Sequence, residues 1–223
     1  KNSSSQSTNN LLKNIFGRFS NGNSSPLSLD DPAIPMTQQN KLSAILATGR
    51  ISNLPTVWCN VLVAFLWVQL APLLVSESLS NTFSLTLFIT TCIAASSLYV
   101  GGCFLGDAVD VEVDLAHKPT RPIPMGILNR QSVYAWASFL LTTGTILPTA
   151  YLYLSTGEYL ASPLIASLAL TGVIIAYSLW HKRSPWAGLP LIGACRFFLI
   201  WFGAITANAY IERQTTGDCV SHA

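Results

Sequence analysis

The acidic residues of this chain are concentrated in one short segment. Four of its ten Asp and Glu residues lie between positions 107 and 114, although charged residues make up only 10% of the sequence. If one helix runs through the segment, Asp107, Asp110 and Asp114 share a face, because their spacing is i, i+3 and i+7. Like charges on one face repel each other unless a cation lies between them. Carboxylates suit Mg²⁺, which takes one or two of them and bridges to substrate phosphates. The spacing therefore predicts a magnesium and diphosphate site.

Basic residues follow the acidic segment directly. Lys118 and Arg121 come next, and Arg121 opens the proline-containing turn RPIPMG, which holds its backbone stiffly. A solvated acidic loop is the alternative, since that is the usual fate of a charge run. The adjoining cations favour the metal site. A second basic group, residues 181–183, could help to neutralise a leaving diphosphate, although membrane topology alone also explains a basic loop there.

Long uncharged intervals indicate the elements that position these residues. Four of them cover residues 51–76, 78–106, 131–157 and 159–181, and a fifth, 184–211, contains only Arg196. Each exceeds the roughly 20 residues that a helix needs to cross about 30 Å of hydrocarbon. We expect five membrane-spanning helices, at about 54–75, 83–105, 131–153, 160–180 and 188–210. The predicted fold class is an all-α integral membrane protein, a multi-span helical bundle.

Composition agrees with this class. Hydrophobic residues make up 50% of the chain, and charged residues fall well below the roughly 25% of ordinary soluble domains. With 12 Lys and Arg against 10 Asp and Glu, the chain lacks the basic excess that binds nucleic acid, so we expect no nucleic-acid partner. Residues 1–40 are rich in Ser and Asn and are predicted to be a disordered tail. Residues 41–223 are predicted to form the membrane domain.

Two polar residues inside the spans are candidate site residues. Arg196 lies about eight residues into the fifth predicted span, where an ionisable group is costly and marks a functional or internally paired site. Snorkelling of its side chain to the interface is the competing interpretation. Asn60, in the first span, could contact a polar substrate or a neighbouring helix.

Charged loops predict the orientation of the bundle. Lys and Arg are concentrated before the first span and in the loops after the second and fourth spans. The only charged residues in the loops after the first and third spans are Glu77 and Glu158. By the positive-inside rule, the N-terminus and the predicted site face the cytoplasm or the matrix or stromal side of an organelle. The compartment itself stays open.

The segment YVGGCFLGDAVDVEVDLAHKPTRPIPMG, residues 99–126, resembles the first aspartate-rich motif of the UbiA superfamily of intramembrane prenyltransferases. Weaker similarities are RISNLPTVWCNVL at 50–62, YSLWHKRSPW at 177–186 and GACR at 193–196. The resemblance implies that Asp107, Asp110 and Asp114 bind Mg²⁺ and are the catalytic carboxylates. It places the diphosphate near a set of cations, Lys118, Arg121, Lys182 and Arg196. Asn60 and Tyr177 are expected in the substrate pocket.

The implied reaction transfers an isoprenoid chain from an allylic prenyl diphosphate to an acceptor. The expected acceptor is aromatic, such as a 4-hydroxybenzoate-type precursor in ubiquinone biosynthesis, or a lipid. Membrane lipid is the surrounding partner. A transporter or channel with an acidic cation vestibule is the alternative from another functional class. Such a vestibule does not require the stiff RPIP turn or basic residues beside the carboxylates, so the sequence favours the enzyme.

Two features depart from the resembled family. Gly106 stands where the family usually has Asn. The family has about nine spans and a second aspartate-rich motif after the sixth. Here the only acidic residues after the fifth span are Glu212 and Asp218. We therefore expect this chain to be a C-terminally incomplete copy of the family domain, with about five of the nine helices.

Overall fold

The computed structural model describes residues 41–70, 83–181 and 185–221. The chain divides into two units, residues 1–38 and 39–223, and the helices below belong to the second. The predicted tail at 1–40 and the predicted diphosphate ligand Lys182 lie outside the described residues.

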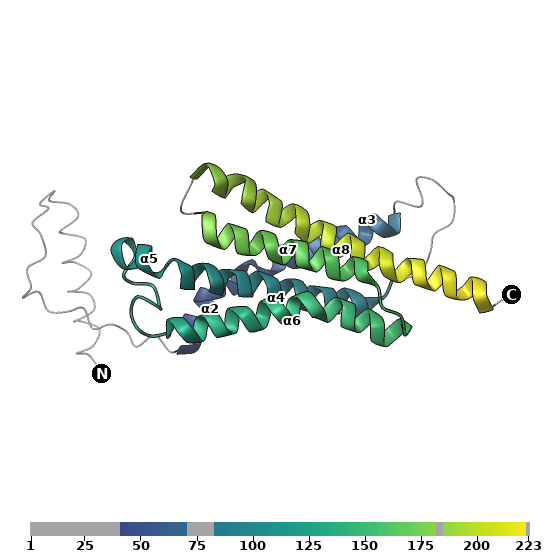
Figure 1. Cartoon of the computed structure of the whole chain (residues 1–223), viewed down its shortest axis with the longest axis horizontal. Helices are drawn as coiled ribbons and strands as arrows, with labels where there is room; N and C mark the ends of the chain where they lie inside the picture. Colours follow the sequence, from purple (N-terminus) through teal and green to yellow (C-terminus); the bar gives the residue numbers. More distant parts are fainter. Residues whose placement is uncertain (1–40, 71–82, 182–184, 222–223) are drawn as a thin grey trace, which may run out of the picture. The chain divides into compact units, whose positions relative to one another are not determined.

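All regular structure in the described ranges is helical (Figure 1). In chain order the elements are α2 (Lys41–Thr48), the short 3₁₀ helix η1 (Ile51–Asn53), α3 (Leu54–Leu70), α4 (Leu85–Val109), α5 (Val111–His117), α6 (Arg130–Thr156), α7 (Ala161–Trp180) and α8 (Pro185–Ser221).

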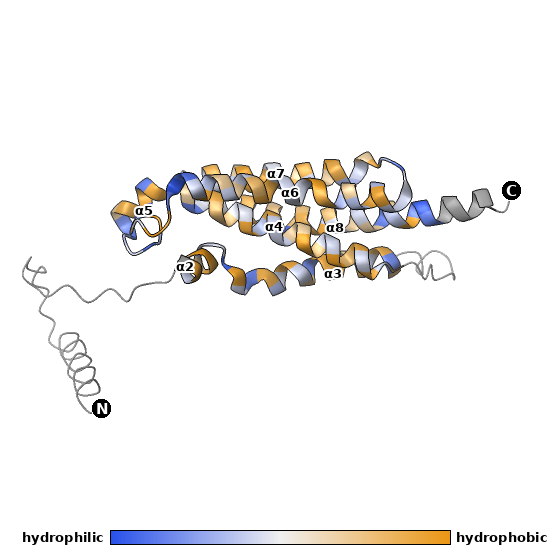
Figure 2. Cartoon of the chain, turned by 90° about the horizontal axis from the view of Figure 1, so that it is seen from below, coloured by the Kyte–Doolittle hydropathy of each residue, from blue (hydrophilic) through white to orange (hydrophobic). Residues whose placement is uncertain are grey.

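Five helical segments are long and apolar enough to cross a membrane. They are Ile51–Leu70, Leu85–Val109, Arg130–Thr156, Ala161–Trp180 and Gly188–Gln214. Their number and order match the five predicted spans, which confirms the predicted fold class. In an 18-residue window of each segment, between 11% and 39% of the residues are buried inside the bundle. Large apolar side chains such as Leu66, Ile93 and Phe139 are exposed, and apolar residues are frequent along the helices (Figure 2). Such surfaces are stable in hydrocarbon because a helix satisfies its own backbone polar groups.

Local sequence defines several helix ends. The Ser84 hydroxyl accepts a hydrogen bond from the Leu87 amide at 3.3 Å and starts α4. The Asn129 side chain accepts one from Gln131 at 2.9 Å and starts α6. Gly157 ends α6 with φ +73, a left-handed conformation that glycine adopts without a steric penalty. The turn after α6 thereby reverses the chain into α7.

Small residues let α4 and α6 approach closely. A Cβ atom added to Gly144 would lie 2.7 Å from Leu98 Cγ and 2.8 Å from the Ala94 carbonyl oxygen. Small residues at an interface let two backbones approach closely and increase van der Waals packing, one of the forces that hold helices together in lipid. The α4–α6 contact therefore fixes the position of α4, which carries the acidic segment.

Gly144→Ala is expected to destabilise the bundle, because the added methyl group must displace a backbone carbonyl or the branch point of Leu98. The expected cost is about 1–3 kcal/mol, measured as a lower midpoint of thermal unfolding in detergent or lipid nanodiscs. Gly172→Ala is the matched control, since nothing lies within 4 Å of its added Cβ. Equal midpoints for the two variants would contradict the close α4–α6 packing.

Hydroxyl groups join α6 to α7. Ser167 donates a hydrogen bond to the Thr145 carbonyl oxygen at 2.8 Å, and the Thr145 and Thr171 hydroxyls lie 2.8 Å apart. In hydrocarbon such interhelical bonds stabilise by about 0.6–2 kcal/mol each. They hold α7, which forms one wall of the cavity described below.

Apart from Arg196 in the α8 span, the charged side chains of the described residues lie towards the two ends of the bundle. At one end, the beginnings of α3 and α8 and the ends of α4 and α7 come together, beside α5 (Figure 1). At the other end, Arg213 of α8 forms an ion pair with Glu158 of the turn between α6 and α7. The apolar spans thus run between two polar ends, and the acidic segment lies at the first of them.

Candidate functional site

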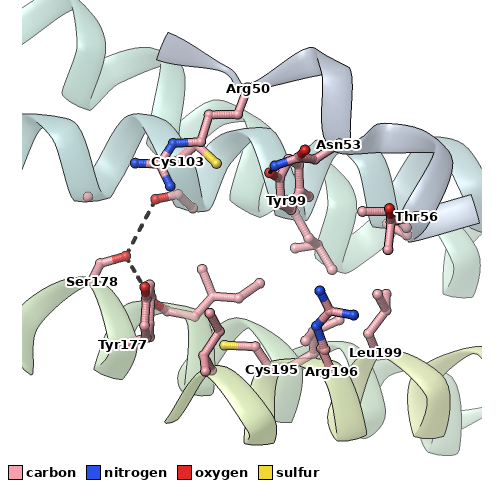
Figure 3. A pocket seen from close by; sticks show the side chains of 18 of the residues that line it. Arg50, Asn53, Thr56, Tyr99, Cys103, Tyr177, Ser178, Cys195, Arg196 and Leu199 are labelled. Atoms are coloured by element: carbon pink, nitrogen blue, oxygen red, sulfur yellow. Dashed lines mark hydrogen bonds between the residues drawn. The ribbon is translucent and has the colours of Figure 1, made fainter. Parts of the chain in front are cut away.

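A cavity of about 380 Å³ opens between α3, α4, α7 and α8 (Figure 3). Its size falls within the range of about 300–1,000 Å³ usual for small-molecule sites. Its polar lining includes Arg50, Asn53, Thr56, Asn60, Tyr99, Asp107, Asp110, Tyr177, His181 and Arg196. Apolar side chains, among them Leu98, Leu170 and Leu199, complete the walls. The cavity therefore combines a charged end with an apolar interior.

Two carboxylates of the acidic segment line the charged end. Asp107 lies in the last turn of α4, and its Oδ1 is 3.1 Å from the Arg121 guanidinium and 3.7 Å from that of Arg50. Asp110 is 7% exposed, and its Oδ2 lies 3.3 Å from Nε2 of His181 at the end of α7. The His181 ring stacks on Tyr177, with centroids 4.8 Å apart. Three helix ends thus bring their charged groups to one place.

Asp114 has a different environment. It is 2% exposed and does not line the cavity, and its Oδ2 lies 2.6 Å from the Arg121 guanidinium. Arg121 thereby bridges Asp107 and Asp114, and ties the turn after α5 to the end of α4. Ion pairs of this length are charge-assisted hydrogen bonds and are about twice as strong as neutral ones.

The condition under which the three aspartates would share one face, a single helix through the acidic segment, is not met. α4 ends at Val109, Asp110 adopts φ −80 and ψ 0, and α5 begins at Val111. The break turns Asp114 toward Arg121, so the three carboxylates divide into two that face the cavity and one that is buried in an ion pair.

The chemistry of the two cavity carboxylates fits Mg²⁺. No group of three His, Cys, Asp or Glu side chains gathers around a metal position in the part of the chain that the structure describes. Asp107 and Asp110 nevertheless face the same cavity, and Mg²⁺ commonly uses only one or two carboxylates, with water and substrate phosphate completing its shell. Asp107 and Asp110 are therefore sufficient, among the described residues, as protein ligands for Mg²⁺.

The other predicted site residues divide into three groups. Asn60 and Tyr177, which were predicted for the substrate pocket, line the cavity, and so does Arg196, which was predicted to bind the diphosphate. Lys118 is exposed at the end of α5 and does not line the cavity, and Arg121 reaches the site through its carboxylate partners. Lys182 lies outside the described residues.

Several cavity residues were not singled out from the sequence as site residues. Arg50 was used only to predict orientation, yet its guanidinium faces Asp107, and its backbone adopts φ 47 and ψ 44, a rare conformation for a residue other than glycine. Asn53 donates a hydrogen bond to the Tyr99 hydroxyl at 3.0 Å and joins the two walls. These residues lie in the segments 50–62 and 99–126, which resemble UbiA-family motifs. That resemblance is the sequence signal that could have identified them.

Comparison with known proteins identifies the class. The model of the UbiA prenyltransferase family matches residues 61–217, so the chain belongs to this family of integral membrane proteins. It is 35% identical to digeranylgeranylglyceryl phosphate synthase of Methanococcoides burtonii over 121 residues, which cover 52% of this chain and 40% of the relative. The synthase of the same name from Methanoculleus marisnigri is 31% identical, with coverages of 67% and 49%.

Two further similarities come from a different enzyme and from a solved structure. Protoheme IX farnesyltransferase 1 of Vibrio campbellii is 28% identical over 52% of this chain and 38% of the relative. A structure from a study of digeranylgeranylglyceryl phosphate synthase in membranes shares the fold, with a TM-score of 0.59 and 19% identity over 74% of this chain and 53% of that one. The chain spans about half the length of the curated relatives it matches.

Proposed function

We propose that this chain takes part in prenyl transfer from an allylic prenyl diphosphate to a small acceptor. The observation that carries the proposal is the cavity, in which Asp107, Asp110 and Arg50 form a charged end and apolar walls continue into the membrane. Arg121 pairs with Asp107 beside this end. A diphosphate with its metal suits the charged end, and an isoprenoid chain suits the walls. Membership of the UbiA prenyltransferase family supports the same assignment.

Asp107 and Asp110 are the residues proposed to hold Mg²⁺. The ion, when bound, supplies Lewis-acid stabilisation to the departing diphosphate. Asp114 is proposed to act through Arg121, by holding its guanidinium beside Asp107. Arg50 and Arg121 neutralise the remaining negative charge of the diphosphate, and Lys182 and Lys118 stay predictions for this role.

The bond changes of the proposed reaction follow from the substrates. The C1–O bond of the allylic diphosphate breaks, and its electron pair leaves with the diphosphate. A nucleophilic atom of the acceptor forms the new bond to C1 and then loses its proton. Apolar side chains such as Leu98, Leu170 and Leu199 exclude the water that would otherwise capture the allylic cation.

The names of the relatives support a lipid acceptor. Digeranylgeranylglyceryl phosphate is, by its name, a glyceryl phosphate with two geranylgeranyl chains, and two of the relatives above are synthases of it. A glyceryl phosphate that already carries one prenyl chain is therefore the first acceptor to test. A 4-hydroxybenzoate-type acceptor, expected from the sequence, is the second, and a tetrapyrrole such as the protoheme of the farnesyltransferase relative is the third.

The proposed orientation places the cavity's charged end on the cytoplasmic side or the matrix or stromal side of the membrane. The described cations Arg50, Arg121 and Arg130 belong to this end, and basic residues are retained on the inner side of membranes. Accessibility of single cysteines to an impermeant thiol reagent would test this orientation.

The experiment uses membranes that contain the chain, radiolabelled geranyl, farnesyl and geranylgeranyl diphosphates, and each acceptor in turn. We expect a labelled, acceptor-linked product that requires Mg²⁺ and is lost with EDTA. Arg213→Gln, at the opposite end of α8, is the control variant that should retain activity. In parallel, binding of a thio-bridged, unreactive prenyl diphosphate should require Mg²⁺. Absence of both binding and product would contradict the proposal.

The channel alternative makes a different prediction. Liposomes that contain the chain would then pass cations, and prenyl diphosphates would not affect the flux. We expect no such flux above that of empty liposomes.

A further inference from the structure

Arg196 is a charged residue in the membrane-spanning part of α8, and nothing in the described part of the chain neutralises it. Its side chain lines the cavity, and no described residue forms an ion pair or hydrogen bond with its guanidinium. A cation within a membrane-spanning segment is costly and by default indicates a function or a partner. An anionic ligand bound in the cavity would therefore supply the negative charge that pairs with Arg196.

The guanidinium points into the cavity. Figure 3 shows Arg196 on the α8 wall, extending across the open space toward the opposite wall, where Tyr99 and Thr56 lie. A side chain that snorkelled would instead run along the helix toward the membrane surface. Thr56 and Asn60 are one turn apart on α3 and also line the cavity. They add a hydroxyl and an amide as hydrogen-bond donors.

Helix geometry separates this position from the diphosphate end. Along α4, Tyr99 precedes Asp107 by eight residues, which is about 12 Å at 1.5 Å per residue. Along α8, Arg196 lies eleven residues after Pro185, about 16 Å from the start of the helix. A diphosphate bound between Asp107 and Asp110 already faces Arg50, and Arg121 is paired with Asp107 beside it. Arg196 is better placed for a second anion, deeper in the cavity.

We propose that Arg196, with Thr56 and Asn60, binds the anionic group of the acceptor, a phosphate monoester or a carboxylate, in a subsite separate from the diphosphate. The inference rests on the proposed function, because it assigns the second substrate of that reaction. It replaces the sequence-based expectation that Arg196 contacts the diphosphate. A planar guanidinium binds both kinds of oxyanion in a bidentate manner, so the two acceptor classes share this requirement.

The test compares matched ligands on the chain in nanodiscs. One pair is a monoprenyl glyceryl phosphate and the corresponding neutral alcohol, and the other is 4-hydroxybenzoate and its methyl ester. For the wild-type chain, we expect the anionic member of at least one pair to bind more tightly by about 10- to 100-fold, the range for a hydrogen bond to a charged group. The pair that shows the preference identifies the source of the anion. No preference in either pair would overturn the inference, whether or not any variant folds.

Variants then assign the preference to Arg196. Arg196→Gln should abolish it, Arg196→Lys should restore part of it, and both should leave Mg²⁺-dependent binding of the thio-bridged prenyl diphosphate within about twofold of wild type. Arg213→Gln, the same change on the same helix outside the cavity, should leave the preference intact. If Arg196→Gln weakens the prenyl diphosphate instead, or if the preference survives it, the second subsite is wrong. Failure of the wild-type chain to bind the prenyl diphosphate would count against the proposed function alone.

Discussion

Asp110→Asn should reduce Mg²⁺-dependent binding of the prenyl diphosphate analogue, and any prenyl transfer, by at least about 100-fold, the loss typical of removing one electrostatic stabiliser from a site. Asp110 lines the cavity and is only 7% exposed, so a lost charge there cannot be replaced by solvent. Asn keeps the shape of the side chain, which separates the effect of charge from that of packing. Titration of the analogue with and without Mg²⁺ measures the effect.

Glu112→Gln is the matched control for this substitution. Glu112 lies two residues away in the same acidic segment, but its side chain is 84% exposed and faces Arg130 rather than the cavity. The control should bind the analogue as the wild-type chain does. Equal losses in both variants would show that the segment acts only through its total charge, and an unaffected Asp110→Asn would remove Asp110 from the site.

Arg121→Met is expected to lower the free energy of unfolding by about 1–3 kcal/mol, the cost of leaving a buried acceptor without its donor, since Asp114 is buried but the Arg121 side chain is 25% exposed. The Asp114 carboxylate is 2% exposed and lies 2.6 Å from this guanidinium, so the substitution deprives a buried charge of its close cation. Reversible unfolding in mixed lipid and detergent micelles gives the free energy. We also expect weaker binding of the prenyl diphosphate analogue, because Arg121 holds Asp107 in place.

A double-mutant cycle tests the physical cause. Asp114→Leu combined with Arg121→Met removes both charges of this pair and leaves Asp107 with Arg50. Apolar replacement of both members of a buried ion pair is often neutral or stabilising. The double variant should therefore be more stable than Arg121→Met alone, with a coupling energy of about 1–3 kcal/mol. Additive losses would mean that Arg121 acts elsewhere in the fold.

The membrane spans could be predicted closely because uncharged length is a one-dimensional property of the sequence. The predicted spans 160–180 and 188–210 correspond to the observed Ala161–Trp180 and Gly188–Gln214. The second span, predicted at about 83–105 from the uncharged interval that ends before Asp107, differs from the observed Leu85–Val109 by a few residues. In the structure α4 continues to Val109, since Arg121 and Arg50 neutralise that carboxylate on the helix.

The division of labour among the three aspartates could not be predicted. Their spacing on an ideal helix is the same whether they share a metal or not, and the difference arises from one backbone break at Asp110. The partner of Asp114 comes from the RPIP turn, whose path over α5 depends on tertiary packing. Arg50 was missed as a site residue for a similar reason, because its contact with Asp107 joins residues far apart in the sequence.

The two polar ends of the bundle also set a preferred bilayer. From Leu85 to Asp107, α4 rises about 33 Å at 1.5 Å per residue, close to the roughly 30 Å of a typical hydrocarbon core. The ion pair of Arg213 and Glu158 marks the far boundary of this slab. In a thinner bilayer the helices must tilt or the lipid must stretch around them, at a cost of fractions of a kcal/mol per ångström of mismatch. Hydrophobic matching thus gives this bundle an intrinsic preference among membranes of different thickness.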